Sequence, residues 1–228
     1  MALKRKFVAA AKGAVPAPAL AALQSVSVSF RNNPHYRYMR WQKRHGEYAF
    51  IHINKCGGTS IETALDIPVK VHDTARQRCN KIGRDAWNRI FTFAVVRNPY
   101  DRVASLYRYR IRTNQTGLGD DRIDLNDWVR EVWQNRNPAY VDQPIMFASC
   151  FEWVTDDDGV IMVDEIIKLE EIDTGWTKVS SKIDGPDTLP RANTTKSGTA
   201  PADALTGESR AIIRAAFSND FRTFGYEA

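Results

Sequence analysis

The sequence has few cysteines, no long apolar run and no internal repeat. Its three cysteines, Cys56, Cys79 and Cys150, are scattered along 228 residues, and their spacing is neither that of a metal site nor that of a disulfide framework. We therefore expect three reduced thiols, as in a reducing compartment. No stretch of about 18 consecutive apolar residues is present, so the sequence predicts no membrane-spanning helix.

The composition is that of an ordinary globular protein. Hydrophobic residues make up 43% and charged residues 26%, which excludes wholesale disorder and a collagen-like chain. A single domain of this length buries a sizeable core. Lys and Arg number 32 against 27 Asp and Glu, a net charge of +5. This excess suggests an anionic partner without choosing among nucleic acid, membrane, acidic glycan and nucleotide.

Residues 1–45 are predicted to be a basic N-terminal extension or strap, ahead of one domain at 46–228. Basic residues precede an Ala-rich stretch, as in a signal peptide, but Lys12, Pro16 and Pro18 interrupt it. We expect this extension to contact a membrane surface or a partner. The cysteine usage favours a cytoplasmic protein, and membrane association or export through this segment is the alternative.

Residues 31–44 mix aromatic with basic side chains. Tyr36, Tyr38 and Trp41 alternate with basic residues, a pattern that can stack on nucleic acid bases. The same pattern suits a strap that packs on the domain. Both alternatives stay open at the level of sequence.

Apolar runs alternate with helical patterns along the domain. The runs at 48–53, 91–96 and 163–169 have the composition of buried parallel strands. A further short strand is predicted at 69–71. Strands alternating with helices indicate an α/β fold with a central, mainly parallel sheet flanked by helices. Helices are expected after Gly58, over 74–79 (capped by Asp73 or Thr74), over 99–112 and over 125–134. A further helix is expected after the last strand, through Trp176, and a terminal helix at 208–217. Long loops are predicted at 113–123 and 184–203.

The first predicted strand leads into a Gly-containing turn and a helix. Gly57 and Gly58 allow close backbone approach, and the helix amides and Lys55 favour an anion. Thr59 and Glu62 have the spacing of a capping box. In the usual triphosphate loop Lys follows the last Gly, whereas here it precedes both. The segment is either a phosphate loop that works without a metal or a plain strand–helix turn.

The strand at 91–96 ends at Arg97, and Asn98 with Pro99 then begins a helix. Arg97 therefore lies at the carboxyl edge of the sheet, where ligands bind in open α/β folds. Ser105 follows two turns into the helix. An arginine fork with a hydroxyl suits a second, separate phosphate. The arginines at 102–112 are predicted to lie mainly on the surface.

Together these motifs resemble those of sulfotransferases that use 3′-phosphoadenosine 5′-phosphosulfate (PAPS), in the carbohydrate-type, family 2-like branch. The resemblance covers residues 46–228. It rests on the segments NKCGGTS (54–60), FAVVRNPYDRVAS (93–105), VDEIIKLE (163–170), LPRAN (189–193) and DFRTFGY (220–226). It implies a P-loop-like three-layer fold, PAPS as donor, adenosine 3′,5′-bisphosphate as product, an acceptor hydroxyl or amine, in the first place a carbohydrate hydroxyl, and no metal.

The resemblance also implies roles for individual residues. Arg97 and Ser105 would hold the 3′-phosphate, and Lys55 would in addition meet the charge that develops on the leaving phosphate. Cys56 stands where relatives often carry Thr or Ser. The residues implied to hold the 5′-phosphosulfate are Lys55, Cys56, Gly57, Gly58, Thr59 and Ser60.

A general base must accept the acceptor proton, and His72 is the first candidate. It precedes a predicted helix whose positive end disfavours the imidazolium, and many sulfotransferases place a catalytic His before the 3′-phosphate strand. His52 is predicted to be buried packing within the first strand. Glu62 and Asp73 are the alternative bases, although Glu62 fits better as a capping residue.

Two other functions remain as alternatives. A nucleotide-dependent kinase would need Mg²⁺ and acidic ligands, for which the sequence offers no convincing candidate. A non-catalytic nucleic-acid-binding protein would use residues 31–44, but two phosphate motifs in order make nucleic acid an unlikely partner. Acceptor specificity is expected from 113–123, 137–160 and 184–203, which carry no diagnostic motif.

Overall fold

The structure, a computed structural model, describes residues 33–190 and 201–228. The Ala-rich segment at 1–30, the centre of the predicted 184–203 loop and the end of the motif at 189–193 lie outside the described residues. The strands are β1 (Tyr48–Ile51), β2 (Phe91–Val96) and β3 (Glu165–Lys168). The α-helices are α3 (Pro34–Arg44), α4 (Gly58–Ala64), α5 (Ala75–Ile82), α6 (Arg84–Trp87), α7 (Pro99–Arg112), α8 (Leu125–Val129), α9 (Cys150–Val154), α10 (Ile172–Ile183), α11 (Gly207–Ala216) and α12 (Ser218–Phe224). Short 3₁₀ segments cover Gln115–Gly117, Pro138–Tyr140, Pro144–Phe147, Leu169–Glu171 and Pro201–Ala204, and a π-helical turn covers Arg130–Gln134.

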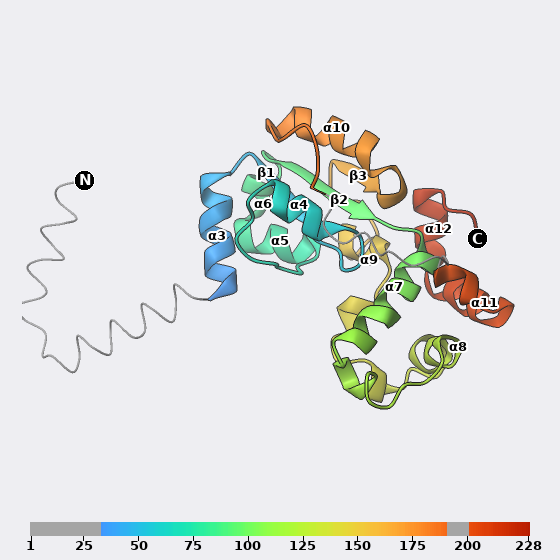
Figure 1. Ribbon diagram of the computed structural model, residues 1–228. Coiled ribbons are helices and arrows are strands. Elements are labelled where there is room, and N and C mark those ends of the chain that lie inside the picture. The colour runs from blue at the N-terminus through green and yellow to red at the C-terminus, as the bar shows by residue number, and fades with distance from the viewer. Residues whose placement is uncertain (1–32, 191–200) are drawn as a thin grey trace, which may run out of the picture.

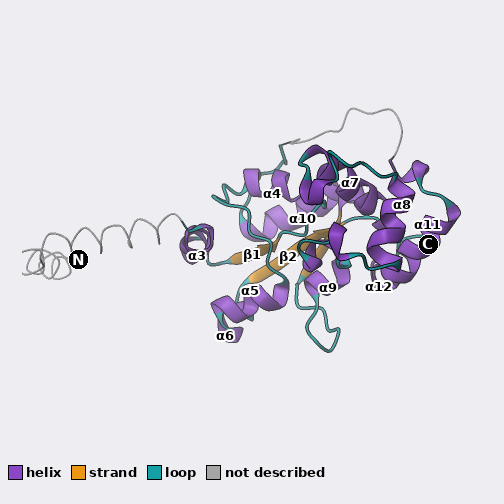
Figure 2. Ribbon diagram, turned by 90° about the horizontal axis from the view of Figure 1, so that it is seen from below, coloured by secondary structure: helices purple, strands orange, loops and turns teal. Residues whose placement is uncertain are grey.

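The described strands form one parallel sheet in the order β1–β2–β3. Tyr48 pairs with Phe91, and Phe93 pairs with Glu165. The central strand β2 is buried along nearly its whole length because it has a neighbour on both sides. Figure 2 shows α4 and α10 on one side of the strands and α5 and α9 on the other. The predicted α/β fold, with helices flanking a parallel sheet, is therefore confirmed and is consistent with a P-loop-like fold.

The hydrophobic core has two parts. One surrounds the sheet, where Phe93 packs against Trp176 of α10 with ring centroids 6.4 Å apart. The other lies among α7, α8, α11 and α12, around Trp128 and Phe217. Figure 1 shows these helices gathered beyond the end of β2, with α7 leading directly away from the sheet. The helix α7 thus connects the sheet edge to the second core.

The aromatic and basic residues ahead of the sheet form α3. Tyr38 and Trp41 are buried in the sheet core, and the guanidinium of Arg78 lies 3.7 Å from the Tyr38 ring. Of the two interpretations of this segment, α3 packs as a strap on the domain. The two buried rings are not available to stack on nucleic acid bases.

Several predicted elements differ in the structure. The predicted strand at 69–71 is wrong: these residues form a loop, because the run is short and follows Pro68, which has no N–H to donate. The helix at 208–217 does not end the chain, since α12 follows it. The carboxylate of Asp220 in α12 accepts hydrogen bonds from the amides of Cys150 and Phe151, both at 2.8 Å. No helix among the described residues is long and apolar enough to cross a membrane.

Candidate functional site

The segment between β1 and α4 forms a tight turn at the carboxyl edge of the sheet. Lys55 has a φ of 66° and Gly57 a φ of 78°, both in the left-handed region that bends the chain sharply. Gly57 is the residue before α4, and no side chain caps the helix. The predicted capping box is therefore wrong. Thr59 instead accepts a hydrogen bond from Lys70 (Nζ–Oγ1 3.0 Å), and Glu62 contacts His52.

The two glycines of this turn are needed for packing. A Cβ on Gly58 would lie 2.2 Å from Cδ2 of His52, and a Cβ on Gly57 would lie 2.6 Å from Cδ1 of Leu169. Both distances are shorter than any real contact between such atoms. From the sequence, these glycines were interpreted as allowing close approach of a phosphate. The structure adds that neighbouring side chains already occupy one side of the turn.

The strand β2 brings Arg97 next to the same turn. The Nη1 atom of Arg97 donates to the carbonyl oxygen of Lys55 at 3.3 Å. Asn98 caps α7 through its Oδ1 atom, which accepts from the amide of Tyr100, and Pro99 occupies the first turn, as predicted. The structure therefore joins the two predicted phosphate elements at one edge. Ser105 is partly buried on α7, and its hydroxyl has no hydrogen-bond partner among the described residues.

Positive charge is concentrated around Lys55. Burial, and after it the nearby Arg112, Arg97 and Arg108, together lower the pKa of Lys55 to about 8. Burial and Arg97 also lower the pKa of Arg108. The Lys55 ammonium lies 4.3 Å from the centre of the Tyr109 ring. Because each cation raises the cost of charging its neighbour, an anion bound here would be stabilised by all of them.

Two of the α7 arginines that were predicted to be on the surface are buried. Arg102 donates to the carbonyl oxygen of Asn54 (3.2 Å), to its side-chain oxygen (2.7 Å) and to the carbonyl oxygen of Ala148. Arg110 pairs with Asp142 at 3.1 Å and donates to Gln115. The prediction was wrong because charged side chains become buried when carbonyl and carboxylate oxygens surround them. Through its bonds to Asn54, Arg102 stabilises the turn between β1 and α4.

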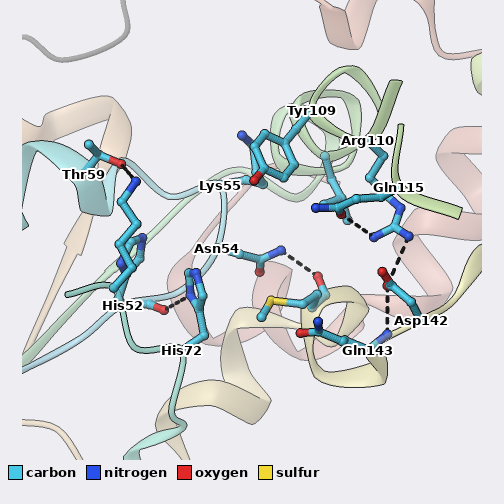
Figure 3. A pocket seen from close by; sticks show the side chains of 13 residues that line it. His52, Asn54, Lys55, Thr59, His72, Tyr109, Arg110, Gln115, Asp142 and Gln143 are labelled. Carbon is cyan, nitrogen blue, oxygen red and sulfur yellow. Dashed lines mark hydrogen bonds and ion pairs between the residues drawn. The ribbon is translucent and has the colours of Figure 1, made fainter. Parts of the chain in front are cut away.

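A cavity of about 290 Å³ opens beside the turn. Figure 3 shows Lys55 and Tyr109 on one wall, His52 and His72 on another, and Arg110 with Asp142 at the opposite end. The residues that line it are His52, Asn54, Lys55, Thr59, Lys70, His72, Leu106, Tyr109, Arg110, Gln115, Asp142, Gln143 and Met146. Three predicted site residues, Lys55, Thr59 and His72, therefore share one cavity, whereas Arg97 and Ser105 do not line it.

The ring of His72 is held in one orientation. Its Nδ1 atom lies 3.0 Å from the carbonyl oxygen of His52, and since a carbonyl only accepts, Nδ1 carries the proton. Nε2 is then the atom able to take a proton. Burial lowers the pKa of His72, and the neighbouring His52 lowers it further. The pKa of the His72 imidazole therefore lies below the ordinary histidine value, which favours its neutral form.

The two alternative bases are already engaged. Asp73 forms ion pairs with Arg78 at 3.0 Å and with Lys81 at 2.7 Å. Glu62 is buried and lies 2.7 Å from Nδ1 of His52. Neither carboxylate lines the cavity. Of the candidates considered, His72 has the geometry of a base.

Lys70 and the side chain of His52 are among the cavity residues that the sequence interpretation missed. Lys70 and His72 are two residues apart, a spacing that would place both side chains on the same side of an extended segment such as the strand predicted at 69–71. That spacing was the signal available for Lys70. His52 was expected to be buried packing, and it is buried, but its ring also reaches the cavity wall.

The cysteines of the site are free thiols. Sγ of Cys56 lies 3.8 Å from Sγ of Cys150, and both side chains are buried. The Cys56 side chain thus points into the protein, and only its backbone is available to a ligand at the turn. Within the described residues, no group of three or more His, Cys, Asp or Glu side chains has the arrangement of a metal site.

The fold and the site define an α/β protein with a cationic sheet edge. Lys55 and Arg97 meet where two parallel strands end, beside a cavity that is lined by His72. The chain matches the model of the sulfotransferase family over residues 39–227, and it belongs to that family. No curated protein and no solved structure matches the chain.

Proposed function

We propose that this sulfotransferase transfers the sulfuryl group of PAPS to a hydroxyl group of a carbohydrate. The observation that carries the proposal is the contact between Arg97 and Lys55, beside a cavity that contains both Lys55 and His72. This contact supports the proposal because the two proposed phosphate-binding elements then lie together at one edge of the sheet, near the proposed base. A single nucleotide with two separate phosphate groups could contact both elements at once.

The residues present fit such a donor. Lys55, Arg97, Arg108 and Arg112 act on one another electrostatically, and a polyanionic nucleotide would relieve that repulsion. Arg97 and the free hydroxyl of Ser105 would hold the 3′-phosphate. Lys55, with the backbone of 56–60, would hold the 5′-phosphosulfate.

Catalysis is proposed to divide between Lys55 and His72. PAPS supplies a sulfuryl group bonded to a phosphate leaving group. The Lys55 ammonium would stabilise the negative charge that grows on that phosphate, which favours the transition state over the ground state. Nε2 of His72 would accept the proton of the attacking hydroxyl. Lys70, anchored to Thr59, would keep a second positive charge on the wall between them.

The far end of the cavity supports a sugar as acceptor. Asn54, Gln115 and Gln143 present amides, and the Arg110–Asp142 pair presents charged hydrogen-bonding groups. Groups of this kind pair with several hydroxyls at once. The Tyr109 ring, on the wall that also carries Lys55, adds an aromatic surface. A hydroxyl-rich acceptor uses these groups better than an apolar phenol would.

Two measurements test the proposal. Calorimetry is expected to show adenosine 3′,5′-bisphosphate binding with equal affinity with and without Mg²⁺, while ATP binding that requires Mg²⁺ would support a kinase instead. Transfer of labelled sulfate from PAPS is then measured on matched panels of glycans, phenols and lipids. Labelling confined to phenols or lipids would overturn the carbohydrate assignment, and absence of nucleotide binding would overturn the donor.

A further inference from the structure

The ring of His52 lies between the phosphate-binding turn and the base. One edge fills the space where a Cβ of Gly58 would be, 2.2 Å from the ring carbon Cδ2 and 2.3 Å from Nε2. The same ring lies beside the ring of His72, with centroids 4.5 Å apart and planes tilted by 54°. His52 therefore touches both halves of the site.

A buried carboxylate fixes the His52 ring. Oε1 of Glu62 lies 2.7 Å from Nδ1 of His52, and both side chains are nearly inaccessible. The second oxygen, Oε2, has no hydrogen-bond partner among the described residues. A buried carboxylate is costly without compensation, so His52 is its principal partner. The contact sets the rotation of the ring and orients Nε2 toward the Gly58 turn.

We propose, building on the function proposed above, that the His52–Glu62 pair is a positioning unit that fixes the position of the His72 ring relative to the phosphate-binding turn. Glu62 fixes His52, and His52 acts on His72 and Gly58 without taking part in bond changes itself. The backbone carbonyl of His52 adds to this role because it accepts the Nδ1 proton of His72.

The pair also affects how His72 titrates. The charged or titratable groups around His72 are His52 from the strand end, Glu62 from α4 and Lys70 from the same segment. After burial, His52 lowers the pKa of His72 most, whereas Glu62 raises it by less. Replacing both side chains therefore raises the pKa of His72, and the base becomes protonated at higher pH.

The test is a double variant, His52→Gln with Glu62→Gln, which replaces the pair by two amides of similar length and leaves no unpaired carboxylate. We expect the acidic limb of kcat/KM to move to higher pH. We also expect kcat to fall by up to about a hundredfold, with a smaller rise in KM for PAPS. The ring-proton NMR titration of His72 reports the same pKa without any acceptor. His45→Gln, a change in an exposed histidine that directly follows α3, is the matched control and is expected to leave all three readouts unchanged.

A folded double variant with the wild-type His72 titration and acidic limb would overturn the proposal, because a purely structural role predicts that result. A failure of wild-type protein to bind the nucleotide or to transfer sulfate would instead overturn the proposed function. The NMR titration distinguishes the two failures, since it tests the coupling of His52 to His72 in the absence of substrate. If the double variant does not fold, Glu62→Gln alone keeps the ring and is followed by the same two measurements. Because it removes only the charge that raises the pKa of His72, the pKa and the acidic limb are then expected to move to lower pH, and an unchanged titration would overturn the proposal.

Discussion

Arg97 donates a hydrogen bond to the backbone carbonyl of Lys55, 42 residues earlier in the chain, at 3.3 Å. The two residues follow the ends of β1 and β2, which are neighbours in the parallel sheet. Parallel neighbours end at the same edge, so two loops that are distant in sequence become one site. Further positive charge at this edge comes from Arg108 and Arg112 of α7, which starts two residues after Arg97.

Replacement of Arg97 by Ala is expected to weaken binding of adenosine 3′,5′-bisphosphate by about 10- to 100-fold. The estimate follows from the loss of one charge-assisted hydrogen bond, worth roughly 1.5–3 kcal/mol. Calorimetry at fixed salt measures it. Arg89→Ala is the control, because Arg89 is exposed and its loss changes the net charge equally. Equal affinity in the two variants would remove Arg97 from the nucleotide site.

His72→Asn is expected to keep nucleotide affinity and to lower kcat by about 10²–10⁴, the usual contribution of a general base. The lowered pKa of His72 has a further consequence in the wild-type enzyme. The base stays neutral as the pH falls below about 6.5, so activity persists there and declines only at lower pH. Rate profiles on wild-type protein measure this. An acidic limb above that value, or a fully active His72→Asn variant, would argue against His72.

Much of the site could be predicted from local sequence patterns. Lys55 follows a buried strand, and Arg97 precedes an Asn–Pro helix start, so their positions at the sheet edge depend on the chain nearby. The approach of His72 to this edge was suggested by the family resemblance. What could not be predicted depends on contacts across the fold. Arg102 has the same sequence context as the surface arginines of α7, and only the oxygens of Asn54 and Ala148 explain its burial.

The capping box shows the same limit. Thr59 and Glu62 have the correct spacing, but Glu62 pairs with a histidine ten residues earlier that the turn brings alongside. A tertiary contact between two buried side chains, Glu62 and His52, therefore replaces the capping box that the local pattern predicts. The helix α12 escaped prediction because its apolar residues, Phe221 and Phe224, complete the two cores rather than a periodic stripe of its own.

Proton uptake is expected when the nucleotide binds near pH 8. Burial and the three arginines hold the pKa of Lys55 at about 8 in the free protein. A bound phosphate favours the ammonium form and raises that pKa, so part of the population takes up a proton on binding. Calorimetry in buffers with different ionisation enthalpies measures the uptake. It is expected to be largest near pH 8, small about two units lower, and absent in Lys55→Arg, which stays charged throughout.

Arg102→Met is expected to lower the free energy of unfolding by about 2–4 kcal/mol, because it leaves buried carbonyl oxygens without their donor. Arg108→Met is the control on the same helix. Arg108 is only partly buried, and its loss is expected to change stability by no more than about 0.5 kcal/mol. Urea unfolding followed by fluorescence measures both. Equal stability of the two variants would mean that Arg102 does not support the turn.

Gly58→Ala tests the packing of the phosphate-binding turn, and Gly207→Ala is its matched control. Each glycine is the first residue of a helix, but only Gly58 has a neighbour in the way, the His52 ring that Glu62 holds in place. An added methyl group forces that ring or the turn to move, and such overpacking typically costs about 1–3 kcal/mol. The methyl group on Gly207 meets nothing within 4 Å, and the reduced freedom of the unfolded chain stabilises the protein by about 0.4–1 kcal/mol. We therefore expect thermal unfolding to show a lower melting temperature for Gly58→Ala and a higher one for Gly207→Ala. Nucleotide binding is expected to weaken in Gly58→Ala alone. A stable Gly58→Ala variant with full affinity would show that the turn does not depend on the ring behind it.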